Sequence, residues 1–334
     1  MHRRRVLVSG VSVATLSLAG CLSDSSGDDS GGSADDDDSA ASTDEEPADL
    51  IESADETLDE AAAEFEAVLD DADDPLDDSS WTIETAGIEA RIDDAEDDLS
   101  TAREAADGDE TDVIDALEGV ADFLREFVDL FVDLGEAMNE LDAWEQYLDQ
   151  ERWDDAETAA GRAAAHNDDA RDHATVARST FEEIDTSVLE EVDEVDAAEM
   201  EAELEEIEDV LELLDVYFSA SELMAEAMQP FENGVESLEV EEFQSASSSF
   251  ESAAETFDDA YSVVTDAEDD APAEFRSDLI DLACEVNALA ESAEYYALGS
   301  EEYADGDWVA GDSYFEDGER ALEQCENNEV VPSL

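Results

Sequence analysis

Apolar residues recur every three or four positions through most of the chain from Pro47 onward, which is the spacing of an amphipathic α-helix. The longest apolar stripes run from Leu117 to Leu148 and from Met200 to Met228, and each predicts one long helix. A second stripe, from Val210 to Phe231, runs beside the latter. We therefore expect the second long helix to contact neighbours on two sides.

Shorter stripes flank the two long ones. One runs from Leu50 to Ala72 and ends before Pro75, and the next begins at Ile83. Together the stripes predict an all-α fold of about eight helices, paired in antiparallel hairpins, that forms an elongated bundle or a short α-solenoid.

The predicted hairpins repeat along the chain. A shift of 90 residues aligns Trp153 with Phe243, and a further shift of 65 aligns Phe243 with Trp308 and Ala253 with Gly318. Small residues at a helix seam let two helices approach closely, and an aromatic residue closes the turn. This pattern resembles the second helix of tetratricopeptide repeats around the turn, although the predicted helices are longer than those of a 34-residue tetratricopeptide unit.

The first 46 residues differ in composition from the rest. Arginines at 3–5 precede an apolar run from Val6 to Ala19, about 14 residues, which is shorter than the roughly 20 that a membrane-spanning helix requires. We expect residues 1–20 to be a signal peptide and residues 21–46, rich in Ser, Gly and Asp, to be a disordered tether. Residues 47–334 then form the helical-hairpin domain, with 47–185 and 186–334 as its candidate halves.

The motifs of this N-terminal region resemble export signals. Arginines 3–5 followed by Val6 and Leu7 resemble the twin-arginine signal, which exports folded proteins. Residues 18–21, Leu-Ala-Gly-Cys, resemble the lipobox of bacterial and archaeal lipoproteins. The resemblance implies that Cys21 carries a diacylglycerol, becomes the N-terminus and anchors the protein to the outer face of the cell membrane. An uncleaved amphipathic N-terminus is the alternative.

The net charge of the chain indicates the kind of solvent in which the protein folds. The chain has 103 acidic residues, 12 arginines and no lysine, for a net charge of −91. Self-repulsion of this size opposes folding in dilute buffer, whereas in about 1 M salt the Debye length falls to about 3 Å. The composition resembles secreted and surface proteins of halophilic archaea and implies diffusely bound cations. A nucleic-acid mimic or a binder of basic partners is the competing interpretation, and an exported protein meets no chromosomal DNA.

Two cysteines of the mature chain, Cys284 and Cys325, lie almost symmetrically about the predicted turn at Ala304–Asp307. An antiparallel hairpin would place them opposite each other. Outside the cell this arrangement predicts a disulfide, and two small buried thiols are the alternative.

No motif of an enzyme stands out. There is no Gly-x-Ser-x-Gly elbow, no Gly-rich phosphate loop and no Glu-x-x-His pair of the kind found in di-metal bundles. We therefore predict a protein that is not an enzyme and needs no cofactor. His166, Asp169 and His173 share one helical face and could bind one divalent metal ion. The alternative is a helix-packing seam with two hydrogen-bonded histidines.

The same predicted helix carries Arg162, Arg171 and Arg178. They form either a patch that binds an anion or an acidic partner, or internal ion pairs with acidic residues such as those at 199–212. Asp107, Asp109 and Glu118 partly match a calcium loop, although Asp112 replaces the glycine of its sharp turn. The alternative is that one helix ends at Gly108 and the next begins with Thr111 as its N-cap, which accounts for the same residues without a calcium ion.

These patterns favour a non-catalytic surface lipoprotein that presents helical repeats to an unidentified protein or envelope partner. The alternative is an extracytoplasmic ligand- or metal-binding component of a transport system.

Overall fold

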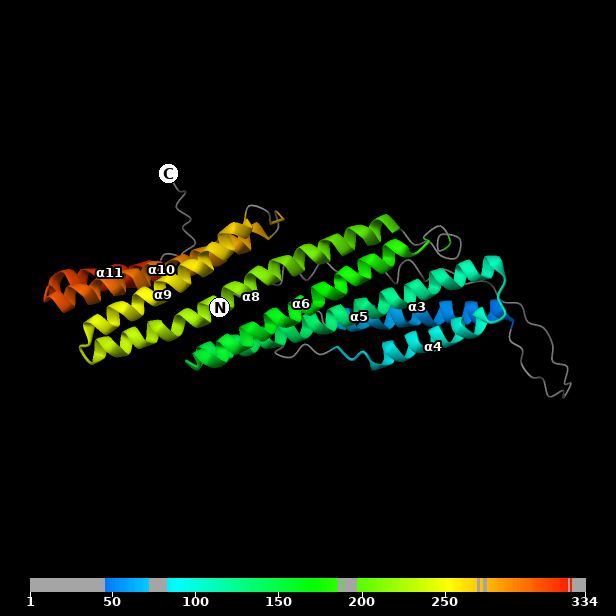
Figure 1. Ribbon diagram of the computed structural model, residues 1–334, viewed down its shortest axis with the longest axis horizontal. Helices are drawn as coiled ribbons and strands as arrows, with labels where there is room; N and C mark the ends of the chain where they lie inside the picture. The colour runs from blue at the N-terminus through cyan, green and yellow to red at the C-terminus, as the bar shows by residue number, and fades with distance from the viewer. Residues whose placement is uncertain are drawn as a thin grey trace. The chain divides into compact units, whose positions relative to one another are not determined.

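The computed structural model describes residues 46–71, 83–185, 188, 197–268, 271–272, 275–323 and 325. Within these residues the chain forms eight helices and no strand, so the all-α class is confirmed (Figure 1). The predicted signal peptide, Cys21 and the predicted tether up to residue 45 lie outside the described residues. None of the described helices is both long enough and apolar enough to span a bilayer.

The helices follow the apolar stripes closely, and short connections join α4 to α5, α5 to α6, α8 to α9 and α10 to α11. Their bounds are α3 Pro47–Asp71, α4 Ala86–Arg103, α5 Gly108–Asp149, α6 Trp153–Glu183, α8 Ala197–Glu239, α9 Phe243–Glu268, α10 Arg276–Asp305 and α11 Trp308–Glu323. The two longest stripes become α5 and α8, of 42 and 43 residues. Pro230 lies inside α8 without ending it.

The described residues divide into two compact units. The N-terminal unit comprises the described residues up to 133 together with 169–208, and the C-terminal unit comprises 134–168 and the described residues from 209 onward. These units are not the halves 47–185 and 186–334 suggested by the sequence. The difference arises because α5, α6 and α8 are each long enough to contribute to both units.

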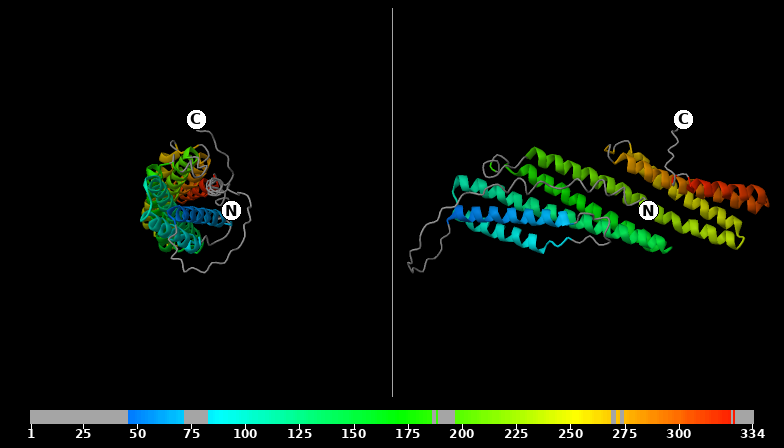
Figure 2. Two further views of the ribbon diagram at one scale, coloured as in Figure 1. Left: turned by 90° about the vertical axis from the view of Figure 1, so that its right-hand side faces the viewer. Right: turned by 180° about the vertical axis from the view of Figure 1, so that it is seen from behind.

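In the N-terminal unit, α3 and α4 form a hairpin and lie side by side (Figure 2). Its core is aromatic: the ring of Phe65 on α3 meets the edges of Phe127 and Phe131 on α5, with centroids 5.9 and 5.5 Å apart. Phe123 of α5 also contacts Phe181 of α6. Each such ring contributes about 1.5–3 kcal/mol through burial, so this cluster holds three helices together.

In the C-terminal unit, α9 and α11 both pack against α10. One core cluster joins Met224 and Ala227 of α8 to Phe257 of α9 and to Val286 and Ala293 of α10. The small residues of this cluster let the helices approach closely, as the sequence pattern predicted. Arg276 closes the connection between α9 and α10, because its guanidinium donates hydrogen bonds to the carbonyl oxygens of Glu268 and Ala271.

Candidate functional site: repeated hairpins and their ion pairs

The C-terminal unit contains three hairpin turns with the same backbone geometry. Glu151, Glu241 and Gly306 occupy equivalent positions under the shifts of 90 and 65 residues, and all three have a left-handed φ, of 58°, 60° and 87°. An L-residue with a side chain rarely adopts this conformation, so the packing of the hairpin must stabilise it at the two glutamates.

The hydrogen bonds of the turns repeat as well. The amide of Glu151 donates to the Leu148 carbonyl, and the amide of the next residue donates to Tyr147. The turns at Glu241 and Gly306 form the same two bonds with their own preceding residues. The three turns are therefore copies of one structure and not merely similar in composition.

The contact between the two helices of a hairpin repeats in the second and third hairpins. Gly234 of α8 faces the ring of Phe250, and a Cβ built at Gly234 would lie 2.7 Å from that ring. Under the shift of 65 residues the equivalent pair is Gly299 and Phe315, where a Cβ built at Gly299 would lie 2.9 Å from the Phe315 ring. Each glycine leaves room for a phenylalanine ring to sit against the helix backbone.

In the first hairpin the large residue of this contact lies on the first helix and the small residue on the second. A shift of 90 residues aligns Gly234 with Trp144 and Phe250 with Ala160. Both Trp144 and Ala160 are buried. The large residue thus lies on the first helix in this hairpin and on the second helix in the other two, so each seam pairs one large residue with one small one.

Aromatic rings connect one hairpin to the next. Phe231 of α8 contacts Phe250 of α9 at 5.2 Å and Tyr296 of α10 at 5.7 Å. Tyr296 in turn contacts Phe250 and Phe315 of α11, each at 5.2 Å. The ridge formed by Phe231, Phe250, Tyr296 and Phe315 therefore runs through four helices. This ridge was not predicted from the sequence, although the 65-residue shift, extended into the first helix of each hairpin, aligns Phe231 with Tyr296.

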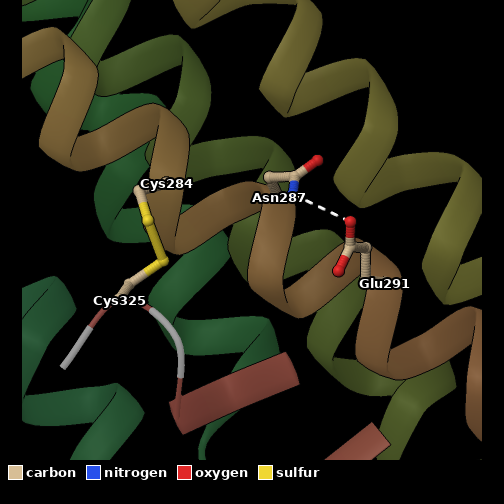
Figure 3. Close-up of a disulfide and its surroundings, with 4 residues drawn as sticks. All are labelled: Cys284, Asn287, Glu291 and Cys325. Atoms are coloured by element: carbon tan, nitrogen blue, oxygen red, sulfur yellow. Dashed lines mark hydrogen bonds between the residues drawn. A yellow bond between two sulfur atoms is a disulfide. The ribbon is translucent and has the colours of Figure 1, made fainter. Parts of the chain in front are cut away.

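Cys284 and Cys325 form a disulfide with a Cα–Cα distance of 5.9 Å (Figure 3). Cys284 lies on α10, and Cys325 lies two residues beyond the end of α11. On the next turn of α10, Asn287 donates a hydrogen bond to Glu291. The disulfide closes a loop across 41 residues of sequence, for which loop-closure entropy gives about 4 kcal/mol of stabilisation.

The arginines of the described residues are engaged within the protein. Arg178 pairs with Glu208 at 2.6 Å, and Arg162 pairs with Glu140 at 2.8 Å. Arg171 also has an interaction partner. Further ion pairs join Arg91 to Glu60 and Glu64, Arg103 to Asp115 and Glu118, Arg125 to Asp93 and Glu96, Arg152 to Asp155, and Arg320 to Asp317. These contacts favour internal pairing over a patch of free guanidinium groups at 162, 171 and 178.

His173 lies among carboxylates of α5 in the N-terminal unit. Its Nδ1 is 2.7 Å from Glu126, and its Nε2 is 3.5 Å from Asp133. Burial by itself would lower the pKa of His173, but the hydrogen bond to Glu126 and the charges of Glu126, Asp129 and Asp133 together raise it. Burial raises the pKa of Asp129 as well. The arrangement suits an imidazolium that donates to carboxylates.

The other two residues of the predicted metal set lie on the same helix, α6. His166 belongs to the C-terminal unit, where its Nδ1 is 3.1 Å from Glu136. Asp169 is exposed. Each histidine therefore has a carboxylate of α5 as its neighbour within its own unit. The hydrogen bond of the packing-seam alternative is formed by His173 with Glu126, whereas His166 lies at ion-pair distance from Glu136.

The segment that partly matches a calcium loop begins a helix instead. Helix α5 starts at Gly108, and the Asp107 carbonyl accepts hydrogen bonds from both the amide and the hydroxyl of Thr111. Glu110 accepts a hydrogen bond from the Asp107 amide, as in a capping box. Glu118 is bonded to Arg103. The prediction of Thr111 as N-cap is therefore wrong, because Asp107 occupies that position.

The repeated hairpins are the feature of this structure best suited to binding, since stacked helical repeats bind partners through extended surfaces. Searches with this chain find no matching protein-family model, no matching characterised protein and no matching solved structure.

Proposed function

We propose that this protein is a non-catalytic helical-repeat interaction module, held on the outer face of a cell membrane by a lipid on Cys21 and working in high salt. The observation that supports binding is the threefold repetition of the hairpin turn at Glu151, Glu241 and Gly306. Helical hairpins that repeat in register build a continuous side-chain surface from successive units, and such surfaces commonly receive proteins or peptides.

The charge distribution supports the proposed solvent. The net charge of −91 leaves most carboxylates without an arginine, because only 12 basic residues face 103 acidic ones. In concentrated salt this repulsion is screened, while the apolar contacts of the hairpin seams persist or strengthen. A binding module in such a solvent relies on apolar and aromatic contacts for affinity and much less on long-range attraction.

The membrane anchor is tested by mass spectrometry of the mature protein. We expect an N-terminus at Cys21 with the added mass of a diacylglycerol, and a Cys21→Ser variant that is released from the membrane fraction. A full-length chain with residues 1–20 retained would contradict the anchor.

The interaction role is tested by photo-crosslinking on intact cells that make the protein. Photoreactive residues replace exposed apolar side chains of the described helices, Val176, Val235 and Leu322. We expect at least one position to capture a specific protein of the envelope. Failure of every position, together with stoichiometric recovery of a small solute or a metal ion from protein purified in high salt, would favour the transport component instead.

A further inference from the structure

The second helices of the three hairpins carry a stripe at equivalent positions, spaced seven residues apart, that is aromatic or apolar except at Asn167. The stripe comprises Trp153, Ala160 and Asn167 on α6, Phe243, Phe250 and Phe257 on α9, and Trp308, Phe315 and Leu322 on α11. Seven residues make two helical turns, so each stripe follows one side of its helix.

In the first two hairpins the following helix covers the stripe. Asn167 is fully buried and donates a hydrogen bond to the Leu211 carbonyl of α8 at 3.1 Å. Phe257 is fully buried in the core cluster that includes Val286 and Ala290 of α10. The stripe of α6 is thus an interface with α8, and the stripe of α9 is an interface with α10.

The turn residue at the head of each stripe makes the same kind of contact with the next hairpin. The indole N–H of Trp153 donates to Glu232 of α8. Phe243 packs against Tyr303 of α10 at 5.3 Å and against Trp308 at 5.4 Å. Both aromatic residues therefore mark the point where one hairpin meets the next.

On α11 the same stripe is open. Trp308 is 52% exposed and Leu322 is 40% exposed, whereas Phe257, the equivalent of Leu322, is fully buried. Phe315 is only partly buried, although its equivalent Phe250 is fully buried. Within the described residues, nothing covers the α11 stripe as α10 covers that of α9.

We propose that the α11 stripe (Trp308, Phe315 and Leu322) is the docking surface for a helix of a partner protein, which stacks on α11 as α10 stacks on α9. The inference rests on the proposed interaction function and names its surface. It follows from continuity with an interface that the protein forms twice internally, because the same positions on α6 and α9 are already helix-binding surfaces. The second and third positions of the stripe are fully buried on α6 and α9, whereas on α11 Phe315 is partly exposed and Leu322 is 40% exposed.

The charges beside the stripe define the chemistry of the partner. Asp312 and Glu319 border it on α11 and are exposed, and Glu316 follows on the same side. The nearest arginine of this helix, Arg320, is paired with Asp317. A helix that packs here carries apolar and aromatic residues along its seam, including one in the role of Tyr296, and arginine or lysine on its flanks. In high salt the seam supplies affinity and the flanking cations set the orientation.

A defined peptide tests this surface. The probe has the sequence of α10 over residues 277–302, with Cys284 replaced by serine and the acidic residues replaced by arginine. Its fluorescence anisotropy is measured with the lipid-free mature protein in about 1 M KCl, where long-range attraction is screened. We expect saturable binding, and no comparable binding of a peptide with the same composition and shuffled apolar residues. Equal binding of the two peptides would overturn the proposal.

Two protein variants with the same added charge locate the peptide. Leu322→Asp alters the stripe, and Val309→Asp alters a side chain of α11 that is 81% exposed and lies off the stripe. We expect Leu322→Asp to weaken binding about tenfold or more and Val309→Asp to weaken it less than about twofold. Circular dichroism and an intact disulfide verify that both variants are folded. Equal effects of the two substitutions would overturn the proposal.

Crosslinking on cells separates this inference from the general function. A photoreactive residue at 322 should capture a partner protein through a helix with basic flanks, and one at 309 should not. Capture at 176 or 235 without capture at 322 overturns the docking surface and leaves the interaction function standing. Capture of a second copy, or of residues 326–334 of the same chain, also overturns the docking surface. No capture at any position contradicts both the docking surface and the interaction function.

Discussion

The hairpin α8–α9 and the hairpin α10–α11 are built on one pattern and differ in what surrounds them. Both place a phenylalanine against a glycine of the first helix, Phe250 on Gly234 and Phe315 on Gly299. In the second hairpin α10 lies over this contact, whereas in the third hairpin nothing described covers it. The comparison shows that one local sequence can serve as core or as surface, depending on whether another helix follows.

In the third hairpin a disulfide takes the place of a helix-packing contact in the second. Helix α9 is 26 residues long and α11 is 16, so α11 buries less surface. Cys325 stands at the position equivalent to Ala260, which is fully buried in the second hairpin. The disulfide to Cys284 holds the end of α11 against α10 where helix packing alone would let it fray.

The largest expected difference between the two hairpins comes from truncating the equivalent phenylalanines. Phe250→Ala should destabilise the protein by about 3–5 kcal/mol, because the ring is fully buried among three helices. Phe315→Ala should cost about half as much, because its ring is partly exposed. Urea unfolding in constant high salt measures both, and equal losses would contradict the assignment of the α11 stripe as surface.

Reduction of the disulfide should act on the third hairpin alone. Loss of the bond removes about 2–4 kcal/mol of stabilisation, and α11 should open while α9 stays protected. Hydrogen exchange of the Cys325→Ser variant measures this. Ala260→Ser, which places the same new side chain at the equivalent position of α9, is the matched control for the substitution itself. Uniform loss of protection across the C-terminal unit would show that the hairpins do not open separately.

The two seam glycines should respond differently to a methyl group. Alanine favours a helix over glycine by about 1 kcal/mol, and the Cβ must displace the facing ring. At Gly234 the fully buried Phe250 ring cannot move, so we expect a net loss of about 1–2 kcal/mol. At Gly299 the partly exposed Phe315 ring can shift, although the backbone carbonyl oxygen of Gly311 also lies 3.2 Å from the added Cβ, so we expect a smaller loss than at Gly234. Thermal unfolding of the two single variants distinguishes these outcomes.

The smallest expected effect is a pH dependence at neutral and acidic pH that lies in the N-terminal unit. The pKa of His173 is raised in the folded state, so the imidazolium stabilises the fold below its ordinary value of 6.5, and this contribution is lost as the pH rises through the raised folded pKa. Burial raises the pKa values of Asp122 and Asp129 in the folded state as well. The stability of the fold therefore again falls as the pH rises, but over the acidic range in which these carboxyl groups lose their protons.

The His173→Gln variant tests this dependence. We expect it to remove less than about 1 kcal/mol below pH 6.5 and little at higher pH, because the histidine is partly exposed and surface ion pairs are weak. Urea unfolding at several pH values measures the loss. The protection of α11 in hydrogen exchange should not change, and a response there would contradict the confinement to the N-terminal unit.

Much of the fold could be predicted from the sequence because its determinants are local. The apolar spacing predicts α5 and α8, and the shifts of 90 and 65 residues predict the repeated turns. The symmetry of Cys284 and Cys325 about one turn predicts their proximity, because an antiparallel hairpin fixes which residues lie opposite each other. The N-cap of α5 could not be decided in this way, because Asp107 and Thr111 are both good caps and only the backbone path distinguishes them.

By itself, the sequence determined the helices, their pairing into hairpins and the equivalence of Trp153, Phe243 and Trp308. Periodicity within a helix identifies an apolar stripe, but it contains no information about which other helix covers that stripe. Only the tertiary structure decided that the stripe of α9 is core and that of α11 is exposed. It also decided that Arg162 and Arg178 pair with Glu140 and Glu208, since an ion pair depends on the distance between helices far apart in sequence.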